Sequence, residues 1–147
     1  MITVLLVDDN DLVRKSLRSL LELTEDIQVV ATASNGVDAV DKACSYCPDV
    51  AVLDIAMPLM NGIEATEHIR ECCRLTRVIL VTGYDTPEYV ERALEVGAKG
   101  YLLKDTVGDD LLKAIHVIYR GSEYFSEKIA QIATRYLGDK GNDNLAA

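Results

Sequence analysis

Four short apolar runs in this chain each end directly at a charged or hydroxyl side chain. Continuous runs of Val, Ile and Leu of this length are typical of strands buried on both faces of a parallel sheet. In an open parallel sheet, ligands bind just beyond the carboxyl ends of the strands. We therefore expect the side chains that follow the runs to meet at one sheet edge, namely Asp8, Asp9, Asp54, Thr82 and Lys104.

The segments between the runs carry apolar residues at helical spacing, so strands and helices alternate along the chain. The expected strands are residues 2–7, 27–33, 49–53, 77–82 and 99–103. Successive βα units with right-handed crossovers favour an α/β fold, a doubly wound five-stranded parallel sheet with the flavodoxin-like order 2-1-3-4-5. That order places the first strand beside the third and makes the three Asp residues neighbours.

Local signals predict where several helices begin and end. Asp11 precedes the first helix, Asn35 caps the second, and Pro48 stops it. Pro87 suits the first turn of a later helix, and Gly97 suits its end. These signals support the alternating pattern independently of the apolar spacing.

The pattern predicts one compact domain over residues 1–121, an amphipathic C-terminal helix over 122–138 and a flexible tail over 139–147. The helix is indicated by an apolar stripe at helical spacing, formed by Ile129, Ile132, Ala133, Tyr136 and Leu137. The tail is polar and rich in glycine.

Composition narrows the function classes. The chain has 147 residues, 49% of them hydrophobic, which is enough for one folded domain. Its 15 basic and 24 acidic residues give a net charge of −9, so we expect no nucleic-acid binding by this chain alone. It shows no signal peptide and no apolar run of membrane-spanning length, from which we expect a soluble, cytoplasmic protein with no membrane partner.

The cysteines suggest no chemistry of their own. Cys44 and Cys47 form a C-x-x-C pair, but this pair closes a helix, whereas a thioredoxin-type pair opens one. A metal site would need a second C-x-x-C or a His pair, and the sequence has neither. We expect these two residues, together with Cys72 and Cys73, to be plain structural thiols.

The three carboxylates predict a site for a hard divalent cation. Unpaired like charges repel, and oxygen ligands suit Mg²⁺, with Mn²⁺ as a possible substitute. A simpler alternative is that Asp8 or Asp9 only caps the next helix. Capping accounts for one aspartate, but not for two together with Asp54.

Asp54 is the best candidate nucleophile, because a carboxylate can accept a phosphoryl group as an aspartyl phosphate. The cation, the Lys104 ammonium and the Thr82 hydroxyl would then neutralise the phosphoryl oxygens. A Lys that follows a strand is usually just solvated, but its place among the other site residues favours a role.

Taken together, these motifs resemble the receiver domain of bacterial two-component response regulators. The matching pieces are Asp8-Asp9, residues 54–62, Thr82-Gly83 and residues 101–105, in order over residues 1–121. Leu102-Leu103-Lys104-Asp105 and residues 121–126 resemble the NarL/FixJ subfamily, whose LuxR-type output is a C-terminal helix-turn-helix. Many receivers have Pro after the lysine, joined by a cis bond; here Asp105 stands there, and a cis bond would cost about 2.5–4 kcal/mol.

The resemblance implies a role for each matching position. Asp54 would be the phosphoacceptor and, with Asp9, a direct Mg²⁺ ligand, while Asp8 would act through water and the Ala56 carbonyl would complete the shell. Lys104, Thr82 and Gly83 would surround the phosphoryl group, and Thr82 and Tyr101 would form the switch. Ala56 and Tyr84 occupy the positions that tune the phosphoryl lifetime in this family.

The resemblance also implies partners. We expect a histidine kinase as phosphodonor and homodimerisation upon phosphorylation. No helix-turn-helix follows in this chain, so DNA binding would belong to a C-terminal domain of a longer parent transcription factor. The last helix would then be its linker, and the alternative is that this helix is a dimerisation element.

Three alternatives stay open at this point. The chain could be a single-domain receiver, or a pseudo-receiver that binds proteins without phosphorylation. A haloacid-dehalogenase-type phosphatase is more remote, because its general acid would stand where the chain has Ala56. We expect a phosphorylated regulatory domain with no enzyme activity beyond its own phosphorylation and dephosphorylation.

Overall fold

The computed structural model of the chain describes residues 1–83 and 86–146. In this part of the chain, six strands form one parallel sheet in the order β2-β1-β3-β4-β5-β6. The strands are β1 (Ile2–Val7), β2 (Ile27–Ala33), β3 (Val50–Asp54), β4 (Arg77–Thr82), β5 (Gly100–Leu103) and β6 (Tyr124–Phe125). The helices are α1 (Asp11–Glu22), α2 (Gly36–Tyr46), α3 (Gly62–Cys72), α4 (Pro87–Glu95), α5 (Val107–Tyr119) and α6 (Glu127–Ala146).

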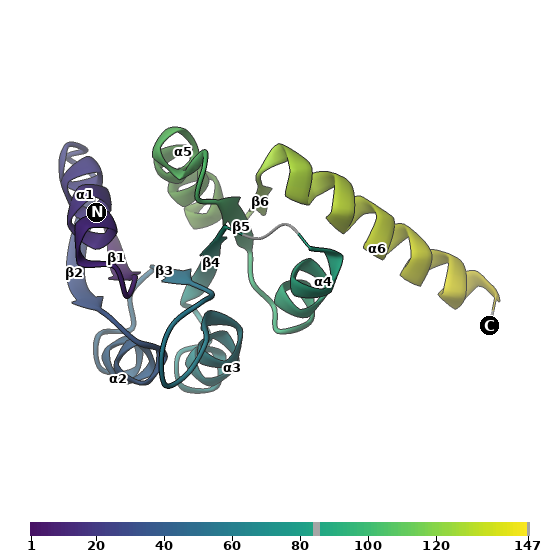
Figure 1. Cartoon of the computed structure of the whole chain (residues 1–147), viewed down its shortest axis with the longest axis horizontal. Coiled ribbons are helices and arrows are strands. Elements are labelled where there is room, and N and C mark those ends of the chain that lie inside the picture. The colour runs from purple at the N-terminus through teal and green to yellow at the C-terminus, as the bar shows by residue number, and fades with distance from the viewer. Residues whose placement is uncertain (84–85, 147) are drawn as a thin grey trace.

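Helices cover both faces of the sheet, as Figure 1 shows. On one face, α1 and α5 bury residues such as Leu21 and Ile115 against the strands. On the other face, α2, α3 and α4 pack with residues such as Ile69 and Val90. Because both faces are covered, the central strands β1, β3 and β4 carry continuous runs of buried apolar residues. The doubly wound α/β fold and the order 2-1-3-4-5 are confirmed.

Short polar side chains begin three of the helices. Asn35 accepts a hydrogen bond from the Asp38 amide at 2.8 Å, as its position in the sequence predicts. The cap of α1 is Asn10, which accepts from the Val13 amide at 3.1 Å, so Asp11 is the first helical residue instead of its cap. Asn61 caps α3 in the same way.

The C-terminal segment differs from the sequence prediction in two ways. A sixth strand, β6, extends the expected five-stranded sheet by pairing Gly100 with Tyr124 and Tyr101 with Phe125. Two residues are too few to show a strand pattern. The helix α6 spans Glu127–Ala146, and so continues past residue 138, where the composition predicted a tail.

The α6 helix packs beside α4, and its far end extends away from the sheet (Figure 1). Its apolar stripe buries Ile129 completely and leaves Ala133 only 3% exposed. Both belong to the same core cluster as Val90 and Ala93 of α4. The stripe therefore has a partner within the described domain.

The prediction of four plain thiols is wrong. The structure joins Cys44 to Cys72 and Cys47 to Cys73 by disulfides. The partners lie 28 and 26 residues apart in the sequence and meet because α2 and α3 run side by side. Considering the C-x-x-C pair alone could not reveal a pairing between two helices.

In the described residues, no helix is long and apolar enough to span a membrane.

Candidate functional site

Strand register brings the expected site residues to one edge of the sheet. Val7 of β1 lies beside Leu53 of β3, so the residues that follow them, Asp8 and Asp54, are neighbours. Between β4 and β5, Thr82 lies beside Leu103, and Lys104 follows directly. The Lys104 amide donates to the Thr82 carbonyl at 2.8 Å and fixes that junction.

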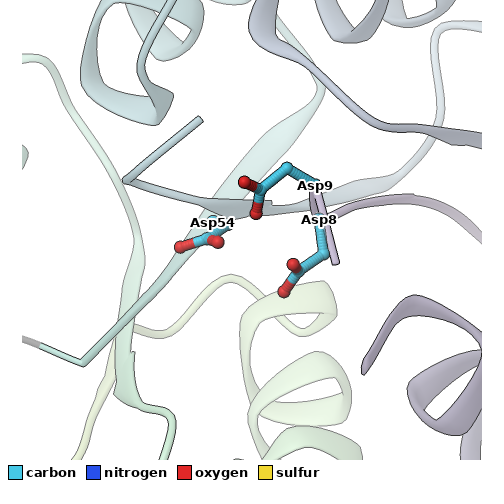
Figure 2. Close-up of side chains that lie close together, drawn as sticks. All are labelled: Asp8, Asp9 and Asp54. Atoms are coloured by element: carbon cyan, nitrogen blue, oxygen red, sulfur yellow. The ribbon is translucent and has the colours of Figure 1, made fainter. Parts of the chain in front are cut away.

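Three carboxylates gather at this edge. One oxygen each from Asp8, Asp9 and Asp54 lies within 4.8 Å of the others. Figure 2 shows Asp8 and Asp9 at adjacent positions, with Asp54 facing them from a separate strand. Asp8 and Asp54 are only 2% and 3% exposed, while Asp9 is exposed to solvent. A site with two buried carboxylates and one solvent-facing carboxylate has the ligand chemistry of a hydrated divalent cation.

The Lys104 ammonium provides positive charge to this cluster. Its Nζ donates to Asp54 Oδ2 at 2.9 Å and lies 3.6 Å from Asp8 Oδ2. Burial lowers the pKa of Lys104, but the hydrogen bond to Asp54 and the nearby carboxylate charges outweigh burial and leave that pKa raised. The lysine therefore stays protonated.

The pKa of the Asp54 carboxyl is raised. Burial is the largest cause, and the charges of Asp8 and Asp9 act in the same direction. The Lys104 hydrogen bond opposes the shift without cancelling it. A bound cation would favour the ionised, nucleophilic form of this carboxyl.

Two residues that the sequence did not single out hold Asp8 in place. The Asn10 amide donates to Asp8 Oδ1 at 2.9 Å, and Arg14 Nη1 donates to the Asp8 carbonyl at 2.7 Å. Both lie at the start of α1, so this helix positions the carboxylate. The capping residue Asn10 gave a usable signal; Arg14 gave none, because charged residues on helix surfaces are common.

The loop after β3 holds Asp54, the last residue of that strand, close to α3. The Ile55 amide donates to Val81 O at 3.1 Å, and the Gly62 amide donates to Ile55 O at 2.8 Å. A Cβ on Gly62 would collide with the Asp54 carbonyl. Glycine is required here for this close approach, although its φ is not in the left-handed region.

The remaining expected residues lie around the same edge. Thr82 is 1% exposed at the end of β4, and Tyr101 is 1% exposed in β5, within the core cluster that includes α4 and α6. Ala56 is exposed, and Gly83 is exposed with open space beside its Cα. Tyr84 lies outside the described residues.

The Lys104–Asp105 peptide bond is trans, as are the other peptide bonds in the described ranges. The non-proline residue at position 105 agrees with this, because a cis bond there would carry the full penalty of an ordinary amide.

The geometry supports one kind of chemistry. The buried Asp54 carboxylate, two further carboxylates, a hydroxyl-bearing strand end and an ammonium share one edge of the sheet. This arrangement can hold a cation and neutralise a phosphoryl group on Asp54.

Comparison with protein families agrees with this arrangement. Residues 4–116 match the family model described as "Response regulator receiver domain". The chain is 41% identical over 121 residues to the transcriptional regulatory protein LnrK of Bacillus subtilis, covering 82% of the chain and 55% of LnrK. It is 39% identical over 130 residues to the nitrate/nitrite response regulator protein NarL of Escherichia coli, covering 88% of the chain and 60% of NarL.

Solved structures show the same fold. A two-component response regulator of the LuxR family from Aurantimonas sp. SI85-9A1 matches with a TM-score of 0.87 and 34% identity, covering 93% of this chain and 99% of that one. The signal receiver domain of the putative response regulator NarL from Mycobacterium tuberculosis matches with a TM-score of 0.78 and 35% identity, covering 82% and 97%. The chain thus spans little more than half of LnrK and NarL, but nearly all of these two structures.

Proposed function

The chain belongs to the response regulator receiver domain family, and from this we propose that it is a phosphorylation-controlled switch whose phosphoacceptor is Asp54. The single observation that carries the proposal is the hydrogen bond from Lys104 to Asp54, within a cluster that also contains Asp8 and Asp9. These are the residues that the chemistry of an aspartyl phosphate needs.

In the proposed reaction, an Asp54 carboxylate oxygen attacks the phosphorus of a phosphodonor. A P–O bond forms, the bond from phosphorus to the donor breaks, and the leaving group departs with the electron pair. Lys104, already oriented by its 2.9 Å hydrogen bond to Asp54, would follow the new phosphoryl oxygens as a point charge. The Thr82 hydroxyl would donate a hydrogen bond to a phosphoryl oxygen.

We propose that Mg²⁺, or Mn²⁺ in its place, is held by Asp9 and Asp54 directly, by Asp8 through water, and by the carbonyl of Ala56. Such a cation would neutralise charge on the phosphoryl oxygens. The exposed position of Asp9 suits a hydrated ion, because Mg²⁺ keeps several of its waters.

The proposed signal passes from Thr82 to Tyr101. Thr82 of β4 lies next to Leu103 of β5. Tyr101, two residues earlier in β5, is buried in the same core cluster as residues of α4 and α6. A movement of the Thr82 hydroxyl toward the phosphoryl group would change the space beside Tyr101 and bias the α4–β5–α6 packing. Gly83 leaves room at the phosphoryl site, and Ala56 and Tyr84 would set the phosphoryl lifetime.

The proposed partners follow from the family. A histidine kinase would donate the phosphoryl group, and the product would form a homodimer. Control of transcription would require a DNA-binding output domain outside this chain. We propose no enzyme activity on other molecules, because Ala56 stands where a general acid would be needed to protonate the leaving group of a phosphate ester.

Intact-mass measurement tests this proposal. The chain is incubated with acetyl phosphate, with and without Mg²⁺, beside Asp54→Asn. We expect one phosphoryl adduct that depends on Mg²⁺ and is absent in the variant. A folded wild-type protein that binds Mg²⁺ but gains no adduct, either from acetyl phosphate or from a phosphorylated histidine kinase, would instead support a pseudo-receiver.

A further inference from the structure

The four cysteines lie together at the C-terminal ends of α2 and α3, away from the acidic cluster at the opposite end of these helices. Cys44 pairs with Cys72 across a Cα–Cα distance of 5.6 Å, and Cys47 pairs with Cys73 across 5.8 Å. Both distances are within the range that an unstrained disulfide spans. In the described residues no cysteine is left free.

The fold brings these residues together through helix packing. Buried Ala39 and Ala43 of α2 and Ile69 of α3 belong to one core cluster and hold the helices side by side. Cys47 ends α2 in a left-handed conformation, with φ 41°, and Cys73 ends α3. Each helix therefore presents two sulfurs to the other at its last turn.

The two disulfides differ in their access to solvent. Cys44 and Cys72 are both exposed. Cys47 is exposed, but its partner Cys73 is only 5% exposed, and Cys73 Sγ lies 3.3 Å from the Ala43 carbonyl. Both residues of one disulfide are thus exposed to solvent, while the other disulfide has one buried residue.

We propose that these cysteines form a thiol–disulfide modification site that exchanges with low-molecular-weight thiols and disulfides, and that joins α2 to α3 only in its oxidised form. A thiolate of the small thiol attacks Cys44 or Cys72, the protein S–S bond breaks, and a mixed disulfide forms. A second small thiol then attacks the mixed disulfide. For each bond, two small thiols are oxidised to one small disulfide, and two protein thiols gain the protons.

Exposure orders the two steps. Attack on Cys47 must expel the Cys73 sulfur as a thiolate into a buried position, and burial disfavours the thiolate form. Attack on the Cys44–Cys72 bond leaves a thiolate on an exposed residue. The Cys44–Cys72 bond therefore opens before the Cys47–Cys73 bond.

Opening both bonds removes two cross-links that close the segment containing β3 and Asp54. Cross-links of this loop length stabilise mainly by restricting the unfolded chain. We therefore expect the reduced protein to remain folded, with a melting temperature lower by about 5 °C or more.

The test is differential alkylation of the whole chain, sampled over time in glutathione buffers of graded reduced-to-oxidised ratio. After acid quenching, N-ethylmaleimide labels free thiols, and intact mass with peptide mapping locates them. We expect no label in the most oxidising buffer and, in the reducing buffers, labels first on Cys44 and Cys72 and later on all four cysteines. The melting temperature should fall along the same series.

Matched variants sharpen the test. Cys44→Ser/Cys72→Ser should keep only the late step, and Cys47→Ser/Cys73→Ser only the early one. Asp54→Asn should leave both steps unchanged, which separates this site from the proposed phosphoacceptor. Four labels in every buffer, disulfides between Cys44 and Cys47, or a zinc ion that copurifies and blocks all four thiols would each overturn the proposal.

Discussion

At the scale of single residues, the site holds two buried carboxylates and one exposed carboxylate against the ammonium of Lys104. Repulsion among them costs stability, and a cation would relieve it. The residues proposed to bind the cation are therefore not those that would stabilise the metal-free domain best. Replacing Asp9, the exposed carboxylate, should change stability and cation binding in opposite directions.

Asp9→Asn should separate these two effects. Without metal, we expect the melting temperature of the variant to rise, because one repelling charge is removed. The rise should be slight, because Asp9 is exposed and solvent screens its charge. With millimolar Mg²⁺, the wild type should gain stability and the variant should gain much less. Thermal melts followed by circular dichroism measure both. Asp41→Asn, an exposed α2 carboxylate outside the cluster, should change neither result.

Lys104→Gln should slow phosphoryl transfer. The variant loses the 2.9 Å contact with Asp54 and the positive charge near the phosphoryl oxygens, so we expect adduct formation from acetyl phosphate to fall by about tenfold or more. The initial rate of mass gain measures this. Lys99→Gln is the matched control, because Lys99 lies in a surface pair with Glu123. Equal slowing in both variants would argue against a specific role for Lys104.

The positions of these site residues could be predicted from the sequence because each follows a buried strand, and parallel strand ends share one edge. The support around them could not. Arg14 and Asn10 act on Asp8 through α1, and the cysteines meet only across two packed helices. Contacts between distant helices leave no periodic signal in either segment.

At the scale of elements, the start of α3 is packed against Asp54, the last residue of β3. Gly62→Ala should therefore destabilise the domain by about 1–3 kcal/mol, because its new methyl group meets the Asp54 carbonyl. Gly108→Ala makes the same change in the first turn of α5, where the space is open. It should stabilise the domain by up to about 1 kcal/mol. Urea denaturation compares the two variants, and a similar effect of both on stability would count against the close approach at Gly62.

The hydrogen bonds that join the start of α6 to the sheet could not be predicted from helix and strand patterns. The Leu103 amide donates to Ser126 Oγ at 3.1 Å, and the Ser126 amide donates to the Tyr101 carbonyl at 3.0 Å. These bonds bind β6 and the start of α6 to the strand that carries Tyr101. The apolar stripe predicted the helix, but its contact with α4 depends on this short strand.

At the scale of the whole molecule, His116 of α5 links the C-terminal half of the chain to the turn between α1 and β2. Its Nε2 lies 2.7 Å from Asp26 Oδ2, in the turn before β2, and its Nδ1 lies 2.7 Å from the Leu112 carbonyl. The hydrogen bond to Leu112 and the Asp26 carboxylate raise the pKa of His116, while burial and the charge of Arg120 oppose this shift. The same pair lowers the pKa of Asp26.

These shifts fix the sign of a pH effect. A raised His116 pKa means that the pair stabilises fully below the unfolded-state pKa of about 6.5 and that this stability is lost as pH rises through the folded-state value. His116→Gln should therefore lower the melting temperature at about pH 5.5 more than at about pH 8.5. An NMR titration should give a higher His116 pKa in the wild type than in the Asp26→Asn variant. The same pKa in both proteins would contradict the ion pair.

The proposed phosphoryl group on Asp54 is an acyl phosphate, a bond that can be trapped chemically at its position in the chain. The chain is phosphorylated with acetyl phosphate and Mg²⁺, reduced with borohydride and mapped by tandem mass spectrometry. Because borohydride reduces an aspartyl phosphate to homoserine, we expect homoserine at position 54 and nowhere else. Homoserine at position 8 or 9, or a phosphoryl group that survives reduction on a hydroxyl or a histidine, would contradict the account.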